Sequence, residues 1–183
     1  MNSLIGYHGT TQENANKILE EKHFKESTKD NEWLGRGVYF FTFRYWAEWW
    51  VRIKKFENVA ILKVNLEYTD EQLLDLDNPE QLITLDKIMQ NVVKQSTLVK
   101  DIDFKTLKNT EVWCFACNFI KQLYPNIGII AYTFQRNQDW HSYIKLCSNQ
   151  RQVCVSNPEI ITKIQQDNGK MFELEIGGVS DIC

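Results

Sequence analysis

The sequence of 183 residues lacks any long apolar run. No segment approaches the roughly 20 consecutive apolar residues that cross a bilayer, and the first residues, MNSLIGYHGT, lack the basic and apolar stretches of a secretory signal. Internal repeats, low-complexity segments and linkers rich in proline or glycine are absent as well. We therefore expect a single cytoplasmic domain over residues 1–183 that makes no contact with a membrane.

The motifs of several common enzyme classes are also missing. The chain has no G-x-S-x-G nucleophile motif and no G-x-x-x-x-G-K-[ST] phosphate loop. His8, His23 and His141 do not have the spacing of metal ligands, and the CFAC segment at 114–117 falls in a helical pattern without a second cysteine pair. We expect no metal site. The five cysteines, an odd number, predict reduced thiols rather than disulfides.

Neither sign of charge is in large excess. The chain carries 21 Lys and Arg residues against 24 Asp and Glu residues, a formal net charge of −3. Such a chain has no overall positive field that attracts nucleic acid or a membrane, although the RIKK cluster at 52–55 is locally basic. Four of the six tryptophans lie between positions 33 and 50, where they either line a ligand cleft or pack in the core.

Apolar periodicity predicts an α+β fold without a regular βαβ repeat, which argues against a doubly wound parallel sheet. Residues 78–110 are expected to form a helical insertion between strands. Strands are expected at 4–8, 37–41, 59–67, 73–77, 126–134, 151–157 and 171–177, and helices at 11–24, 44–55 and 109–124.

Two short segments predict a ligand site. In YHGTT, residues 7–11, His8 ends a strand and can offer a ring nitrogen to a sugar hydroxyl, while Gly9 lets a flat amide approach its backbone. In LGRGVYFF, residues 34–41, Tyr39 offers a ring face on which a heteroaromatic group can stack. Such a site suits a nucleoside. The alternative is structural, a hairpin turn followed by a core tyrosine.

Together these segments resemble the ADP-ribosyltransferases of the diphtheria-toxin and poly(ADP-ribose) polymerase type. That family has a Y-H-G-[ST] element, matched here at 7–10, and a G-x-G-[IV]-Y-F element, matched at 35–40. An alanine-aromatic helix follows, matched at 47–49. The match is specific over residues 5–50 and again near 150–161, and it implies split antiparallel sheets flanked by helices, with NAD as the substrate.

The resemblance also implies roles for individual residues. His8 would bond the adenosine ribose, Gly9 would bond the nicotinamide amide, and Thr10 belongs to the same NAD-binding element. Tyr39 and Trp49 would sandwich the nicotinamide ring. With a residue on a later strand, these side chains are expected to converge on one dinucleotide pocket.

That later strand is where the sequence departs from the family. The segment RQVCVSNPEII, 151–161, has Gln152 in place of the catalytic glutamate. An amide keeps the hydrogen bonds to the nicotinamide ribose but loses the charge that stabilises the oxocarbenium-like state. Poly(ADP-ribosyl) transfer is therefore doubtful, and mono-transfer or slow NAD hydrolysis is favoured. Gln150 takes this place if the register shifts by two, and a polar residue on an edge strand is the structural alternative.

The loop 135–142 occupies the place of the family's acceptor-recognising segment, and loops on a rigid scaffold often carry specificity. A solvated loop with one anchoring tryptophan is the alternative. Glu48 and Asp139 are candidates to deprotonate the acceptor. The hypothesised acceptor contacts are Arg136, Asp139, Trp140 and His141.

These features predict an NAD-dependent mono-ADP-ribosyltransferase that acts on a protein or nucleic acid. Arg36 and Arg44 are candidates to pair with the NAD phosphates, with surface solvation as the alternative. Analogy with compact bacterial members implies a toxin or phage-defence effector, with a neutralising antitoxin protein as a candidate partner. Two other readings remain: a non-catalytic NAD or ADP-ribose binding module, motivated by Gln152, and an RNA 2′-phosphotransferase-like enzyme, which needs more cations around the cleft.

Overall fold

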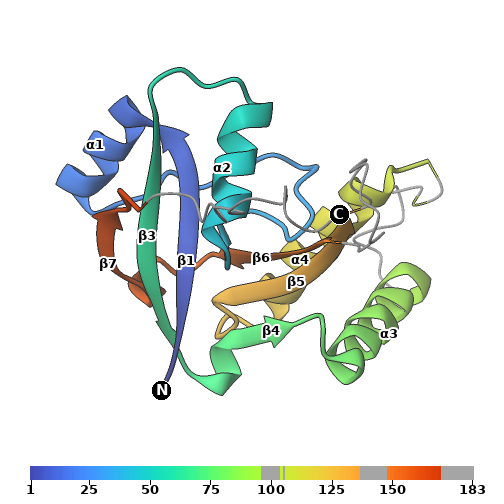
Figure 1. The fold of residues 1–183 in the computed structure, drawn as a ribbon. Helices are drawn as coiled ribbons and strands as arrows, with labels where there is room; N and C mark the ends of the chain where they lie inside the picture. The colour runs from blue at the N-terminus through green and yellow to red at the C-terminus, as the bar shows by residue number, and fades with distance from the viewer. Residues whose placement is uncertain (96–103, 105, 137–147, 170–183) are drawn as a thin grey trace, which may run out of the picture.

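The computed structural model describes residues 1–95, 104, 106–136 and 148–169, which form a mixed α/β fold around a seven-stranded sheet (Figure 1). In chain order the elements are β1 (Asn2–Thr11), α1 (Gln12–Glu21), β2 (Val38–Phe41), α2 (Arg44–Ile53), β3 (Val59–Tyr68), β4 (Leu73–Asp75), α3 (Pro79–Gln95), α4 (Asn109–Leu123), β5 (Ile129–Arg136), β6 (Ser148–Val155) and β7 (Ile161–Gln166), with short 3-10 turns at Asp70–Gln72 and Pro158–Ile160. None of the helices in these ranges combines the length and the apolar character needed to cross a bilayer.

The sheet has the order β4-β5-β6-β2-β1-β3-β7. Only β4 and β5 pair in parallel among the described strands, so the expected α+β class is confirmed at this level. The expected helical insertion is helical over Pro79–Gln95. A strand at Ile161–Gln166 was not expected, and the strand expected at 171–177 lies outside the described residues.

The shortest pairing between neighbouring strands of the sheet is that of β1 with β2. Within the described residues these strands pair at one position, Tyr7 with Phe41, whereas β1 and β3 pair continuously from Asn2 to Thr11. Figure 1 shows that β1 and β3 run across the direction of β5 and β6. The strands therefore form one sheet with two well-paired halves, β4-β5-β6-β2 and β1-β3-β7, joined at a short junction.

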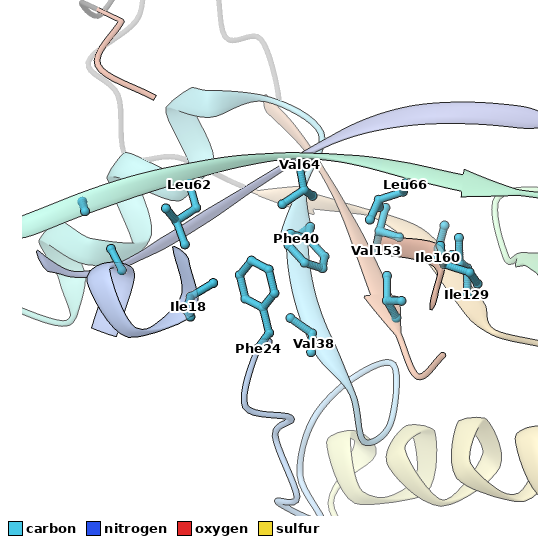
Figure 2. Packing of buried hydrophobic residues seen from close by; sticks show 14 residues of the cluster. Ile18, Phe24, Val38, Phe40, Leu62, Val64, Leu66, Ile129, Val153 and Ile160 are labelled. Atoms are coloured by element: carbon cyan, nitrogen blue, oxygen red, sulfur yellow. The ribbon is translucent and has the colours of Figure 1, made fainter. Parts of the chain in front are cut away.

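The main core lies on one face of this sheet, beneath α1. Alternate residues of β2 and β3 point into it, including Phe40, Leu62 and Val64, which are fully buried (Figure 2). Helix α1 contributes Ile18, and its first turn is fixed by the Thr11 hydroxyl, which accepts a hydrogen bond from the Asn14 N–H. Burying each large side chain contributes about 1.5–3 kcal/mol.

Two further clusters cover the opposite face. Under α2, Trp46, Ala47 and Val51 pack on Phe41 of β2, so this helix places one of the clustered tryptophans in the core. Under α4, Cys117 and Ile120 pack on Ile130 of β5 and on Leu34 and Cys154. We call these residues and their neighbours the second cluster. The described cysteines 114, 117 and 154 are free and buried.

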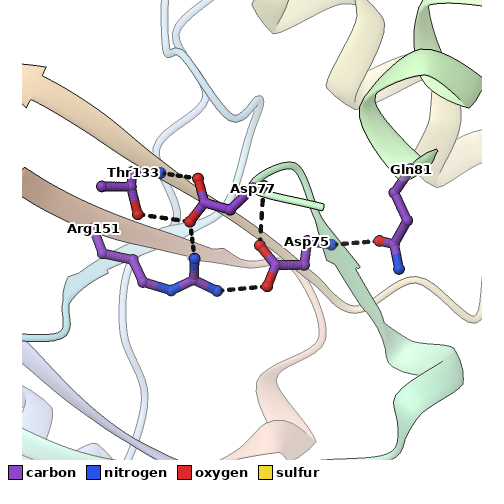
Figure 3. Close-up of polar contacts among 5 residues, drawn as sticks. All are labelled: Asp75, Asp77, Gln81, Thr133 and Arg151. Carbon is purple, nitrogen blue, oxygen red and sulfur yellow. Dashed lines mark hydrogen bonds and ion pairs between the residues drawn. The ribbon is translucent and has the colours of Figure 1, made fainter. Parts of the chain in front are cut away.

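An ionic cluster ties the edge strand β4 to β6 (Figure 3). Arg151 of β6 pairs with Asp75 at 2.9 Å and with Asp77, whose carboxylate also accepts hydrogen bonds from the backbone and hydroxyl of Thr133 on β5. Burial opposes the charge of Arg151, but the two carboxylates outweigh this effect and raise its pKa. The guanidinium therefore stays charged and holds three strands together.

We expect Arg151→Met to lower the free energy of unfolding by about 1–3 kcal/mol, because Asp75 and Asp77 then lie half-buried without a cation. The matched control is Arg36→Met. The Arg36–Asp30 pair has side chains 56% and 81% exposed, so its loss should leave the free energy of unfolding close to that of the wild type. Urea unfolding measures both, and equal losses would contradict the cluster's role.

Candidate functional site

His8 marks the point where β1 and β2 separate. Its Nδ1 lies 2.9 Å from the Tyr39 carbonyl oxygen. A carbonyl can only accept, so Nδ1 carries the hydrogen and Nε2 is left with a lone pair in the neutral ring. The rings of Phe24 and Phe40 flank the imidazole at centroid distances of 5.3 and 5.9 Å. Burial lowers the pKa of His8, and the bond to Tyr39 offsets only part of that effect, so the ring is neutral at pH 7.

Gly9 directs its backbone groups toward this separation. Alternate residues of an antiparallel strand point their N–H and C=O groups at opposite neighbours. The Tyr39 carbonyl faces β1, because it accepts from His8, and the backbone of Phe41, two residues later, faces β1 as well. Phe41 pairs with Tyr7, so the backbone N–H and C=O of Tyr7 point toward β2. Those of Gly9, two residues later, point the same way. Beyond the Tyr7–Phe41 pair the two strands are no longer paired. We call the space between them there, bordered by the Tyr39 carbonyl and the Gly9 backbone, the fork.

The other side of Gly9 is closed by α2. A Cβ atom at this position would lie 2.4 Å from the Ala47 carbonyl oxygen and 2.8 Å from Val51 Cγ1. Only glycine allows the helix to approach the strand this closely. The fork is therefore backed by the helix that carries the tryptophans.

Tyr39 points away from His8, to the opposite face of the sheet. Its hydroxyl donates to the Gly35 carbonyl at 2.7 Å and accepts from the Leu34 N–H at 3.0 Å. Burial raises the pKa of Tyr39, and so the hydroxyl stays protonated. The ring packs in the second cluster beside Leu34 and Cys154.

Side chains of α4 hold the loop that leads into Tyr39. The sequence did not predict these contacts. Lys121 Nζ donates to the carbonyls of Arg36 at 2.7 Å and Leu34 at 3.2 Å, and Asn118 Oδ1 accepts from the Arg36 N–H at 2.7 Å. Asn118 and Lys121 are three residues apart on one helix face. A polar pair on a helix that is otherwise rich in buried residues is a pattern in the sequence that could have predicted such a contact.

Gln152 lies on the same face of the sheet as Tyr39. It pairs with Phe41, and its Nε2 donates to Gln150 Oε1 at 2.8 Å. Gln150 is fully buried. The position of the family's glutamate therefore holds an amide bonded to a second amide.

Trp49 packs in the cluster under α2, where its ring lies 5.7 Å from that of Trp46, whereas Tyr39 belongs to the second cluster. His8 faces the main core from the other side of the sheet. The expectation that all four side chains line one open pocket is therefore corrected. Tyr39, Trp49 and Gln152 share a face, and His8 is joined to them through the Tyr39 main chain.

The two arginines expected to bind phosphate already have carboxylate partners. Arg36 pairs with Asp30 at 2.7 Å on the surface. Arg44 pairs with Glu48 and, at 3.2 Å, with Asp167, so Glu48 is not a free base.

The remaining predicted residues are buried or incompletely described. Thr10 is buried, and its hydroxyl oxygen lies 3.5 Å from Asn14 Nδ2. Arg136 is the last residue of β5. Asp139, Trp140 and His141 lie outside the described residues. In the part of the chain that is described, no three His, Cys, Asp or Glu side chains gather as a metal-binding group.

We expect the free energy of unfolding to fall as the pH drops below 6.5, the ordinary pKa of histidine, because the unfolded chain then takes up a proton that folded His8 resists. Urea unfolding at pH 7.5, 6.5 and 5.5 measures this. The wild-type protein should lose more stability over this range than His8→Asn. Identical pH profiles for wild type and His8→Asn would contradict the assignment.

Comparison with known proteins gives one relative to report. A protein of Methanocaldococcus jannaschii described as "Uncharacterized protein MJ0359" is 27% identical over 184 residues, which covers 87% of this chain and 85% of the archaeal protein. No family model matches the chain, and no solved structure matches it significantly. The similarity extends over most of both chains.

Proposed function

We propose that this protein is an NAD-dependent mono-ADP-ribosyltransferase that transfers ADP-ribose to a protein or nucleic acid. The observation that carries the proposal is the fork, where the His8 Nδ1–Tyr39 bond leaves Nε2 as an acceptor beside the backbone of Gly9. A ribose hydroxyl needs an acceptor of this kind, and a carboxamide needs one N–H and one C=O. The separation of the sheet into two halves supports the split-sheet architecture expected from the resemblance.

In the proposed reaction, the bond between the nicotinamide nitrogen and ribose C1′ breaks, and its electron pair leaves with nicotinamide. The acceptor's nucleophilic atom forms the new bond to C1′ and gives up its proton to solvent. His8 Nε2 accepts a hydrogen bond from a ribose hydroxyl, and Gly9 positions the carboxamide of the leaving group. This chain's contribution is chiefly positioning and desolvation of the bond that breaks.

Gln152 limits the rate in this proposal. Its amide lies on the face of Tyr39 and supplies hydrogen bonds without charge, so the positive charge that develops on the ribose has no carboxylate beside it. The proposed activity is therefore slow, and it stops at single ADP-ribose units. A role as a toxin or phage-defence effector, with an antitoxin partner, belongs to the same proposal.

A second candidate function is a non-catalytic NAD or ADP-ribose binding module. It is favoured by the absence of charge at Gln152 and by the ion pair that occupies Glu48. An RNA 2′-phosphotransferase-like enzyme gains no support, since Arg36 and Arg44, the cations that it would use, both pair with carboxylates.

The function is tested by incubating the protein with NAD and measuring nicotinamide release, with calorimetry of NAD binding beside it. We expect slow release by the wild type and an increase of about tenfold or more in Gln152→Glu, because the resemblance implies that a carboxylate at this position stabilises the charge that develops on the ribose. Binding without release in the wild type, with release restored by Gln152→Glu, would favour the binding module. The absence of NAD uptake in both would end the proposal.

A substitution at Gly9 tests the fork itself. We expect Gly9→Ala to abolish NAD uptake, because its Cβ would push α2 away from the strand. The matched control is Gly128→Ala, whose Cβ would meet Ile160 Cδ1 at 2.6 Å, away from the fork. Both changes cost about 1–3 kcal/mol of stability. If both variants bind NAD equally well by calorimetry, Gly9 has no role in the site.

A further inference from the structure

The C-terminal end of α2 presents a basic and aromatic surface. Its exposed cations are Arg52, Lys54 and Lys55, and it is followed directly by Phe56, which is 39% exposed. Lys55 adopts a left-handed backbone conformation, with φ of 53°, as the helix ends. We call Tyr45, Trp50, Arg52, Lys54, Lys55 and Phe56 the basic-aromatic patch.

Two of the three cations of this patch lie over aromatic rings rather than beside carboxylates. The Arg52 guanidinium carbon lies 5.7 Å from the Tyr45 ring centroid, and Lys54 Nζ lies 4.5 Å from that of Trp50. Within the described residues, no ion pair involves Arg52, Lys54 or Lys55. The three other arginines with described side chains all pair with carboxylates, namely Arg36, Arg44 and Arg151.

A hollow adjoins the patch. It has a volume of about 490 Å³ and lies between α2 and the ends of β3 and β7. Arg52 belongs to both the hollow and the patch, and the rest of the wall combines aliphatic and amide side chains with the ion-paired Arg44, Glu48 and Asp167. The cations and rings of the patch, rather than the hollow, therefore fit a strand of phosphates and bases.

We propose that the basic-aromatic patch binds single-stranded nucleic acid. Its three cations lie along phosphates, and the exposed ring of Phe56, beside the partly buried rings of Tyr45 and Trp50, stacks on a base, which is how proteins hold single strands without sequence preference. Binding to a surface of anionic lipid is the alternative outcome of the test below. Because the chain carries a net charge of −3, the binding is local and weak, in the micromolar range.

The patch would also serve the proposed function, on which this part of the inference rests. Ala47, which packs on Gly9 at the fork, lies five residues before Arg52 on the same helix, a rise of about 7.5 Å. Nucleic acid held on the patch is therefore close to the fork, and nucleic acid is the acceptor class that the surface favours.

Fluorescence anisotropy with a labelled 20-mer of deoxythymidine at about 50 mM salt tests the inference. We expect micromolar binding by the wild type and a loss of about tenfold or more in Lys54→Glu/Lys55→Glu, with the salt slope reduced by about 1.4. The matched control is Lys87→Glu/Lys94→Glu, the same charge change at exposed positions of α3, which Figure 1 shows apart from α2. This control should stay within about twofold of the wild type.

Three outcomes would overturn the inference: no binding by the wild type, equal losses in both double variants, or binding to vesicles of anionic lipid without binding to the oligonucleotide. Arg52→Gln is a second variant with a smaller change of charge, and it should weaken binding in the same direction. Nicotinamide release, measured on the same preparations, decides the proposed function separately. Oligonucleotide binding without any release would overturn that function and leave the patch intact.

Discussion

The bond between His8 Nδ1 and the Tyr39 carbonyl is the interaction on which the candidate site depends. It lies where β1 and β2 stop pairing, and a side chain there takes the place of a ladder hydrogen bond between the strands. The same bond fixes the tautomer of a neutral imidazole and therefore decides that Nε2 is an acceptor. Structure and chemistry are joined at this position, because any change that breaks the bond alters both the junction and the tautomer of the imidazole.

The main chain around this bond is held from several directions. Tyr39 is fixed by its own hydroxyl to the loop before it, and α4 fixes that loop through Asn118 and Lys121. On the other side, α2 packs directly on Gly9. Three elements from distant parts of the sequence thus fix a few backbone groups, which is the rigidity that positioning a ligand requires.

The sequence predicted the elements with strong periodicity and missed those held by long-range contacts. The helix expected at 44–55 is Arg44–Ile53, and the strand expected at 59–67 is Val59–Tyr68, because both carry a clear apolar face. The strand at Ile161–Gln166 was not predicted because four of its six residues are polar. Likewise, partners such as Asp77 for Arg151 or Lys121 for the Arg36 carbonyl are set by tertiary packing and leave no local pattern. The motifs identified His8 and Gly9, but the local sequence could not show that the side chains of His8 and Tyr39 point to opposite faces of the sheet.

The order of strands has a consequence for how the protein is made. β2 lies at the centre of the sheet, yet its neighbour β6 is synthesised late, and Phe40 finds Val153 only after most of the chain has left the ribosome. Until then β1, β3 and α1 can assemble locally, while one edge of β2 stays unpaired and open to other chains. The pairing of β2 with β6 thus forms late, although it lies at the centre of the sheet, and until then the free edge of β2 exposes the nascent chain to aggregation.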